Sequence, residues 1–423
     1  PPSTLYILVK STRKAWSILA AEAHNNPQDS LKIVAITGTN GKTTTAWMLT
    51  KILASLGFKA GYIGTLGSSF CKDQAAAHTT PDPDVLFQQL HQAKVEGYEY
   101  VTLEASSHAI DLGKLSAIKF SALVFTSFSR DHLDYHKTLE HYLKTKLSLF
   151  LNNRAPLAPS FIHTNLIPLL EKKFLEQVNP IFYCEQQQRP LSSHLKVYSY
   201  RKKQEDLRGT TLSLSLQQKD HTAKIPFLGQ HNSDNFFVAT LVAERLTHKI
   251  QTEKWQNIKQ IPGRLERVLP KQESLPAIFI DFSHTPDALR KSLSFIKKHN
   301  TQGRTLVVFG CGGERDKGKR PLMGAAAEEI ADQIILTADN PRRENLSKII
   351  ASIKKGIKAH EKILVIHDRK QAIYKALDTI KKEDCLLLAG KGHETYQEIE
   401  ETKHPFSEKK IIEEYYQMRL TNQ

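Results

Sequence analysis

The feature that most constrains the fold of this chain is a glycine-rich segment between an apolar run and a helical pattern. The run at 33–36 predicts a buried strand, and helical spacing follows in Ala46, Met48, Leu49, Ile52 and Leu53. Between them stands G-T-N-G-K-T-T, residues 38–44. In a strand–turn–helix unit the glycines let backbone N–H groups close on phosphates, the lysine reaches the outer phosphates, and the threonine hydroxyl can bind Mg²⁺. We therefore predict a site for a nucleoside triphosphate and Mg²⁺.

Length and composition are typical of soluble globular proteins. At 423 residues, with 40% hydrophobic and 24% charged residues, the chain can form two or three domains. No run approaches the roughly 20 apolar residues that span a bilayer, so we expect no membrane association. The sequence opens with Pro1-Pro2 instead of Met, and we expect it to begin inside a longer protein.

The net charge of +15 and the cysteines argue against other classes. Lys and Arg are scattered, and no nucleic-acid module is recognisable, so we expect solvated faces and polyanionic substrates but no nucleic acid. The cysteines at 71, 184, 311 and 385 lie far apart without a C-x-x-C pair. That spacing argues against a disulfide framework or a zinc site and favours a cytoplasmic location.

Alternating strands and helices predict an α/β fold. A short strand at 6–9 and a helix through Trp16 come first. Continuous apolar strands then favour a mostly parallel sheet covered on both faces, with strands at 32–37, 100–104 and 121–126 and helices at 43–56, 84–96 and 138–151. The alternating run 211–216 predicts antiparallel strands. After a hinge at 262–263, a second series predicts strands at 277–281, 305–310, 333–337, 363–366 and 385–389.

Polar clusters follow many of these strands, at the edge where ligands collect in open α/β sheets. In the first series, Glu104 and His132 follow adjacent predicted strands and could hold a hard cation bound to phosphates. In the second series, Arg315 and Arg342 suit carboxylates, whereas Asp339 and Glu394 suit an ammonium group. Groups of both signs in one region predict a site for a zwitterion such as an amino acid.

The order of these motifs resembles the Mur ligase family. The matching segments are G-T-N-G-K-T-T, E-A-S-S-H (104–108), S-R-D-H-L-D-Y-H (129–136), L-G-Q-H-N-S-D-N (228–235), F-S-H-T-P-D-A-L (282–289), G-C-G-G-E-R-D-K-G-K-R-P (310–321), D-N-P-R (339–342) and A-G-K-G-H-E (389–394). The resemblance runs from about residue 5 to the C-terminus. It implies the tail of a uridine-binding domain at 1–30, a central P-loop domain at 31–262 and a Rossmann-like C-terminal domain at 263–423.

The resemblance also implies an ATP-dependent amide ligase. Its implied ATP-binding residues are Gly38, Thr39, Asn40, Gly41, Lys42, Thr43, Thr44, Asn235, Arg264, Asp281 and His284. The implied Mg²⁺ ligands are Thr43, Glu104, His132 and Lys146, the last as a carbamate. Lys42, Lys146 and His284 are the implied catalytic residues.

The D-N-P-R motif resembles members of the family that add meso-diaminopimelate to a UDP-N-acetylmuramoyl dipeptide, in cytoplasmic peptidoglycan precursor synthesis. The implied contacts to the UDP-sugar dipeptide are Thr79, Thr80, Ser106 and Lys114. The implied diaminopimelate site comprises Arg315, Asp339, Asn340, Pro341, Arg342, Gly390 and Glu394. We expect a monomer that acts on these small molecules.

Alternatives stay open at this point. One is a ligase of the same fold that adds lysine or, as in folylpolyglutamate synthase, glutamate, although the D-N-P-R motif argues against both. Another is a nucleotide-binding regulatory protein without ligase activity. Leu112, Lys114 and Ser127 depart from residues frequent in the family.

Overall fold

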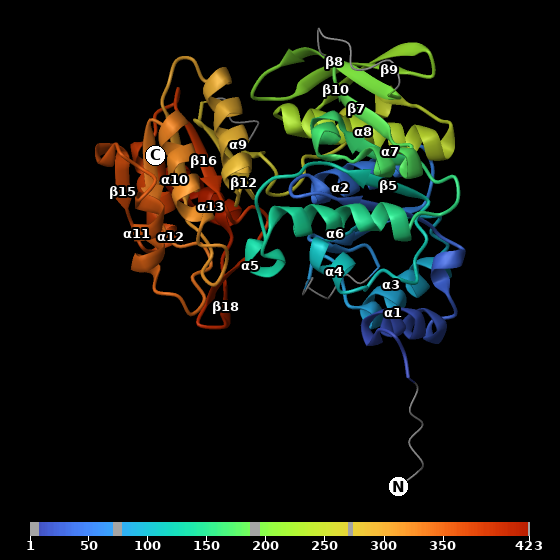
Figure 1. Ribbon diagram of the computed structural model, residues 1–423. Helices are drawn as coiled ribbons and strands as arrows, with labels where there is room; N and C mark the ends of the chain where they lie inside the picture. Colours follow the sequence, from blue (N-terminus) through green and yellow to red (C-terminus); the bar gives the residue numbers. More distant parts are fainter. Residues whose placement is uncertain (1–7, 71–77, 187–194, 270–273, 422–423) are drawn as a thin grey trace.

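The computed structural model describes residues 8–70, 78–186, 195–269 and 274–421, which form two units that each consist of a sheet covered by helices on both faces (Figure 1). The α/β class predicted from the sequence is confirmed. Among the described residues, we find no helix with the length and hydrophobicity that a membrane span requires. Cys184, Cys311 and Cys385 are buried free thiols, and Cys71 lies outside the described residues.

The first sheet has ten strands and is parallel in its centre. Its order is β10 (Lys219–Ile225), β9 (Thr210–Leu216), β8 (Val197–Glu205), β7 (Ile181–Glu185), β6 (Ser160–His163), β5 (Ala122–Phe125), β1 (Lys32–Thr37), β4 (Tyr100–Glu104), β2 (Ala60–Gly64) and β3 (Gly67–Ser68). Strands β2, β4, β1, β5, β6, β7 and β8 pair in parallel, and β3, β9 and β10 add antiparallel edges. The antiparallel pairing predicted around 211–216 is confirmed.

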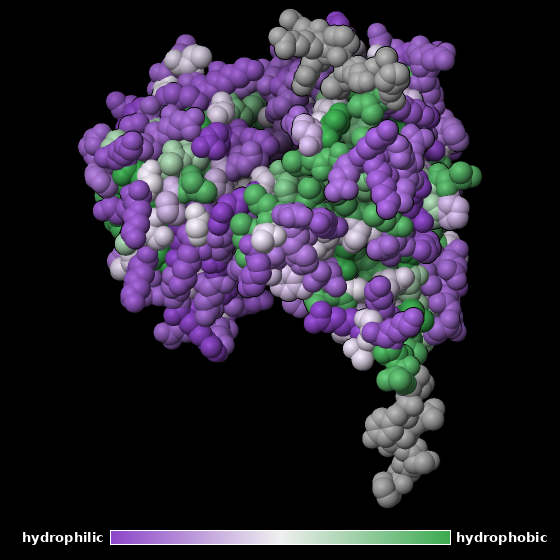
Figure 2. Space-filling model, viewed as in Figure 1, coloured by the Kyte–Doolittle hydropathy of each residue, from purple (hydrophilic) through white to green (hydrophobic). Residues whose placement is uncertain are grey.

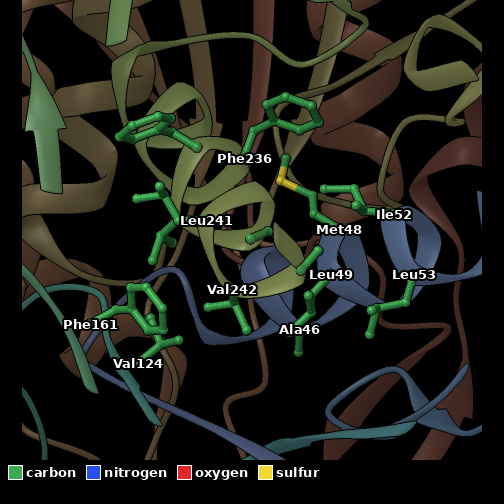
Figure 3. Packing of buried hydrophobic residues seen from close by; sticks show 14 of the residues in the cluster. Ala46, Met48, Leu49, Ile52, Leu53, Val124, Phe161, Phe236, Leu241 and Val242 are labelled. Carbon is green, nitrogen blue, oxygen red and sulfur yellow. The ribbon is translucent and has the colours of Figure 1, made fainter. Parts of the chain in front are cut away.

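Successive residues of β1 point to opposite faces of this sheet and fill two cores. Val34 and Ile36 pack under α2 (Lys42–Ser55) and α8 (Gln230–Thr247), whose buried side chains interlock (Figure 3). Ile33 and Ala35 pack under α1 (Thr12–Ala23), α3 (Pro83–Val95), α6 (Leu139–Asn152) and α7 (Lys172–Val178). Burial of both faces explains why these strands are apolar without alternation.

The second sheet has six strands in the order β11 (Glu266–Val268), β12 (Ala277–Asp281), β16 (Cys385–Ala389), β13 (Thr305–Phe309), β14 (Gln333–Leu336) and β15 (Ile363–Val365). All pairs except β11–β12 are parallel. One face carries α9 (Pro286–His299), α10 (Lys319–Ile330) and α11 (Leu346–Lys354). The other carries α12 (Arg369–Thr379) and α13 (Glu408–Thr421). A hairpin of β17 (Tyr396–Ile399) and β18 (Thr402–Pro405) follows β16.

The structure differs from the sequence-based expectations at the N-terminal end, where an expected strand is not found, and in the first sheet, where strands occur that were not expected. For the strand expected at 6–9, residues 6 and 7 lie outside the described residues, and Leu8 and Val9 form no strand. The sequence reasoning did not anticipate β2, β6 or β7.

In the space-filling view the surface is mostly hydrophilic, and hydrophobic residues show chiefly on the half that holds the ten-stranded sheet (Figure 2).

Candidate active site between the two sheets

A cavity of about 690 Å³ lies between the two sheets and takes side chains from both. This volume is in the range of small-molecule and cofactor sites. Residues at or just after the ends of β1, β4 and β5 line one side, and residues at or just after the ends of β12, β13, β14 and β16 line the other. The lining includes these residues predicted from the sequence: Thr39, Asn40, Gly41, Lys42, Thr43, Thr44, Thr79, Glu104, His132, Asn235, Arg264, Asp281, His284, Arg315, Asp339, Asn340, Arg342, Gly390 and Glu394.

The loop between β1 and α2 requires glycine at two positions. Gly38 has φ +149°, and a Cβ there would lie 2.1 Å from Thr126 Oγ1. Gly41 has φ +88°, a left-handed conformation, and a Cβ there would lie 2.7 Å from Asn235 Oδ1. Ser127 holds the loop, because its Oγ accepts from Asn40 N and donates to Asn40 O, both at 3.0 Å.

At the start of α2, polar groups gather around a buried carboxylate. Lys42 Nζ donates to the carbonyl oxygens of Gly38 and Thr39, both at 2.9 Å, and burial lowers its pKa despite the opposing effect of Glu104. Thr43 Oγ1 donates to Glu104 Oε2 at 2.9 Å and accepts from Arg264 Nη2 at 3.0 Å. Glu104 is 0% exposed. Its carboxylate is therefore held in place beside the loop.

Two further elements complete the setting of Glu104. Thr65 donates to it through its backbone N–H at 2.9 Å and its hydroxyl at 3.2 Å, and the Tyr62 hydroxyl donates to Oε1. Burial raises the pKa of Tyr62 well above its usual value, and the nearby carboxylate of Glu104 raises it further. Tyr62 therefore stays a protonated donor.

Asp131 is buried between the two halves of the protein and contacts residues of both. The sequence reasoning did not single it out. Its carboxylate lies 3.4 Å from His132 Nε2, 3.7 Å from His284 Nε2 and 3.9 Å from Lys319 Nζ. Burial alone would raise the pKa of Asp131, but the His284 hydrogen bond and the charge of Lys319 hold it well below its usual value. The carboxylate thus links the first sheet's β5 loop to two segments of the second unit.

His132 stands in a left-handed conformation, with φ +53°, and lines the same cavity. Burial lowers its pKa to about 3, so its imidazole is neutral and keeps a lone pair. The described residues contain no group of three or more His, Cys, Asp or Glu side chains arranged as metal ligands. Mg²⁺ does not need such a group, because it takes one or two carboxylates and completes its shell with waters and phosphate oxygens. The oxygen donors Thr43 and Glu104, already 2.9 Å apart, fit such an ion.

Lys146 lies behind the loop on α6 and is 1% exposed. Its Nζ donates to Gly38 O at 3.0 Å and sits 4.6 Å from the centre of the Tyr142 ring. Burial lowers its pKa well below the usual value, and Lys42 lowers it further. The amine is therefore driven toward its neutral, nucleophilic form.

Asp281 organises the part of the second unit that faces the glycine-rich loop. Its carboxylate accepts from Leu265 N at 2.5 Å and from Ser292 Oγ at 3.1 Å. The guanidinium of Arg264 stacks over Phe282 at 4.5 Å, and Asn40 Nδ2 reaches Thr285 Oγ1 at 3.4 Å. These contacts bring the connecting segment and β12 against the loop of β1.

The opposite wall carries the groups expected to bind an amino acid. Asn340 Nδ2 donates to Glu394 Oε2 at 2.9 Å, and the fully buried Lys391 donates to both Asn340 Oδ1 and Glu394 Oε2, each at 2.9 Å. Asp339 lies against Gly390, where a Cβ would come within 2.4 Å of Asp339 Oδ2. Arg315 lines the cavity and makes no hydrogen bond or ion pair to a described residue. Both signs of charge thus face one space.

The other predicted residues lie outside the cavity lining. Thr80 Oγ1 donates to Glu104 O at 2.7 Å and to Ser106 Oγ at 3.1 Å, so both support the end of β4. Lys114 pairs with Asp82 at 2.5 Å. Pro341 accepts a hydrogen bond from Glu344 N at 3.0 Å within its own loop.

Four residues missed by sequence reasoning as site residues are Asp131, Lys319, Lys391 and Glu398. The first three stand inside quoted motifs, S-R-D-H, G-K-R-P and G-K-G-H-E, so their signal was present. Glu398 stands outside every motif and pairs with Arg342 at 3.0 Å. Only the pairing of the hairpin with the D-N-P-R loop reveals it.

Comparison with known proteins agrees with this geometry. The Mur ligase middle domain matches residues 36–243, and the Mur ligase, glutamate ligase domain matches residues 263–392. The UDP-N-acetylmuramoyl-L-alanyl-D-glutamate--2,6-diaminopimelate ligase 1 of Clostridium acetobutylicum is 35% identical over 424 residues, covering 98% of this chain and 84% of the relative. The corresponding ligase of Aquifex aeolicus is 37% identical over 415 residues, covering 96% and 82%.

A solved structure of a UDP-N-acetylmuramoyl-L-alanyl-D-glutamate--2,6-diaminopimelate ligase superimposes with a TM-score of 0.65 at 31% identity, covering 98% of this chain and 84% of that one. The two domain matches fall on the two sheets that enclose the cavity. This chain is therefore a member of the Mur ligase family.

Proposed function

We propose that this protein joins meso-diaminopimelate to UDP-N-acetylmuramoyl-L-alanyl-D-glutamate in an ATP-dependent amide ligation. The observation that carries the proposal is that residues 39–44 of the loop and the residues Asp339, Asn340 and Arg342 line one cavity. A phosphate site and a zwitterion site in one space suit the coupling of phosphoryl transfer to attack by an amine. The relatives that match over most of their length carry this ligase name.

The first step activates a carboxylate, which is otherwise a poor electrophile. A carboxylate oxygen of the D-glutamyl side chain attacks the γ-phosphorus of ATP, the bond to the β-phosphate oxygen breaks, and acyl phosphate and ADP form. Lys42 and the N–H groups of the loop stabilise the charge that develops on the transferring phosphoryl group. Asn235 on α8 of the first unit, together with Arg264, Asp281 and His284 of the second unit, completes the site for the nucleotide. Thr43, Glu104 and His132 would hold Mg²⁺, which neutralises phosphate charge when bound.

The second step forms the amide. The lone pair of a diaminopimelate amine attacks the acyl carbon, the tetrahedral intermediate loses phosphate, and the nitrogen releases a proton. Asp339 and Glu394 orient the ammonium end of the amino acid, and Arg315 and Arg342 bind carboxylates. Lysine has no second carboxylate, so binding it would leave the arginine unpaired. That unpaired charge would select against lysine by roughly a hundredfold or more.

Lys146 carries a further part of this proposal. A buried neutral amine attacks CO₂ and, after losing a proton, becomes a carbamate with a negative charge. We propose this modification because burial and Lys42 lower the pKa of Lys146 and because it lies 3.0 Å from Gly38 O in the loop. The carbamate would add an oxygen ligand near the Mg²⁺ site.

We also propose that the units 31–262 and 263–423 close on each other about the segment at 262–263, excluding water from the acyl phosphate. Contacts across the cavity support this proposal: Arg264 with Thr43 at 3.0 Å and Asp131 with His284 at 3.7 Å. Residues 1–30 would be the tail of a uridine-binding domain, and Thr79, Thr80, Ser106 and Lys114 would contact the UDP-sugar dipeptide. We expect a cytoplasmic monomer, with sedimentation velocity as the measurement of its state.

The test is phosphate release with ATP, Mg²⁺ and the UDP-sugar dipeptide, in the presence of meso-diaminopimelate, L-lysine or no amino acid. Release that depends on diaminopimelate, with an acyl phosphate that hydroxylamine traps, is the expected result. Release with lysine instead would keep the chemistry and refute the assigned substrate. Tight ATP binding without release under any condition would refute the ligase and leave a nucleotide-binding protein.

A further inference from the structure

The hairpin β17–β18 is bonded to the loop that carries the D-N-P-R motif. Gln397 Nε2 donates to Asp339 O at 2.8 Å, and Glu398 N donates to Asn340 Oδ1 at 2.9 Å. Arg342 N donates to Glu398 O at 3.1 Å, and Glu400 N donates to Arg342 O at 3.1 Å. The hairpin thus fixes the positions of three residues of the proposed amino-acid site.

Arg342 depends on the hairpin for its conformation. Its φ is +52°, a left-handed conformation that costs a non-glycine residue about 1–2 kcal/mol. Such a conformation persists where its surroundings enforce it. Two backbone hydrogen bonds to the hairpin, one to Glu398 in β17 and one from Glu400 in the turn, provide that enforcement, and the side chain lines the cavity.

The guanidinium of Arg342 is also held at two of its three nitrogens. Nη1 donates to Gly313 O at 2.8 Å, and Nε pairs with Glu398 Oε2 at 3.0 Å. The side chains of Arg342 and Glu398 are 18% and 24% exposed, so the pair is partly screened from water. With Nε and Nη1 bound, the plane of the guanidinium is fixed, and Nη2 makes no hydrogen bond to a described residue, so it remains for a ligand.

We infer that Glu398 is a positioning residue that sets the selectivity for an amino acid with a second carboxylate. It orients the Arg342 guanidinium before the substrate arrives, so less side-chain freedom is lost when the far carboxylate binds. This inference rests on the proposed function and adds to it an element of specificity outside the family motifs. Glu398 itself need not touch the substrate.

The variant Glu398→Ala tests this role by steady-state phosphate release. We expect KM for meso-diaminopimelate to rise roughly ten- to hundredfold while kcat stays within about threefold, because a charge-assisted contact is lost in binding only. KM for ATP should not change. Glu398→Gln keeps an oxygen beside Nε but lacks the charge, so it should recover part of the loss.

A neighbouring ion pair supplies the matched control. Arg343 is the residue after Arg342, and it forms an ion pair with Glu401 in the turn of the hairpin. Their side chains are 63% and 68% exposed, respectively. Glu401→Ala therefore removes a carboxylate from the same hairpin without touching Arg342, and we expect wild-type kinetics. Thermal melting of all three variants would show whether each is folded.

The selectivity readout separates positioning from a structural role. Turnover with lysine, which lacks the second carboxylate, should change little in Glu398→Ala, so the preference for diaminopimelate over lysine should fall at least tenfold. Equal losses for both amino acids, or a KM for diaminopimelate within twofold of Glu401→Ala, would overturn the inference. Absence of diaminopimelate-dependent release in the wild type would instead refute the proposed function.

Discussion

Arg369 offers a severe test of how the amino-acid wall is supported. It begins α12, it is fully buried, and its partner Glu408 begins α13. The guanidinium donates to Glu408 Oε1 at 2.9 Å, to Ala338 O at 3.0 Å and to Ala389 O at 2.8 Å. Ala338 and Ala389 directly precede Asp339 and Gly390, so one cation ties together the strand ends that present both residues.

The variant Arg369→Met should be strongly destabilised. It leaves the Glu408 carboxylate buried without its partner, which costs about 3–5 kcal/mol. Two buried carbonyls lose a donor, which adds about 1 kcal/mol or more. A domain of this size loses about 2–4 °C in Tm for each kcal/mol, so we expect Tm to fall by roughly 8–24 °C.

Differential scanning calorimetry measures this change, and two variants control it. Lys370→Met, on the next residue and on the exposed side of α12, should shift Tm by less than about 1 °C. Adding Glu408→Gln to Arg369→Met removes the unpaired charge and should restore several degrees. A decrease in Tm of less than about 2 °C for Arg369→Met would refute this reasoning. A double variant that is no more stable than Arg369→Met would refute it as well.

Three other perturbations test the site and its surroundings. Gly41→Ala, at φ +88° with a Cβ only 2.7 Å from Asn235 Oδ1, should weaken binding of an ATP analogue at least roughly tenfold by calorimetric titration; unchanged affinity would contradict the assigned strain. Lys146→Met should lower kcat by roughly a hundredfold or more, and wild-type enzyme stripped of CO₂ should regain activity with bicarbonate; indifference to bicarbonate would exclude the carbamate. Hydrogen bonds from Arg320 lower the pKa of Glu344 from 4.5 to about 2, so its stabilisation is full above pH 4.5 and lost as pH falls toward 2. The melting curve of Glu344→Gln should therefore lose that acid dependence, and an unchanged pH profile would count against it.

Much of the fold could be predicted because local patterns were strong. The run 33–36, the glycine loop and the spacing of Met48, Leu49 and Ile52 each reflect a local geometric requirement, and β1 and α2 form there. Strand β2 was missed because Ala60-Gly-Tyr-Ile-Gly lacks the apolar run expected of a buried strand. The structure explains its glycines: a Cβ at Gly61 would meet the Phe70 ring at 2.2 Å, and one at Gly64 would meet Glu104 Oε1 at 2.3 Å.

The site was predictable where a residue stands in a motif with its own chemistry. Lys42, Thr43 and Glu104 gather around the loop as the strand ends suggested. The sequence could not distinguish Asp131 from an ordinary capping residue. The contacts that set it apart are with His284 and Lys319, which lie more than a hundred residues away along the chain. No sequence motif marked Glu398, because its partner Arg342 is in the loop after β14, whereas Glu398 is in β17.

The sequence by itself determined the α/β class, the phosphate-binding loop and the polar ends of the strands, because each depends on residues close together along the chain. The tertiary structure decided which strand ends face each other, since strand order and the packing of the two units bring distant loops to one cavity. It also decided which charges are paired and which remain for a ligand. Arg342 is held by Glu398 while Arg315 faces the cavity, and that difference arises from contacts across the fold, which no local pattern encodes.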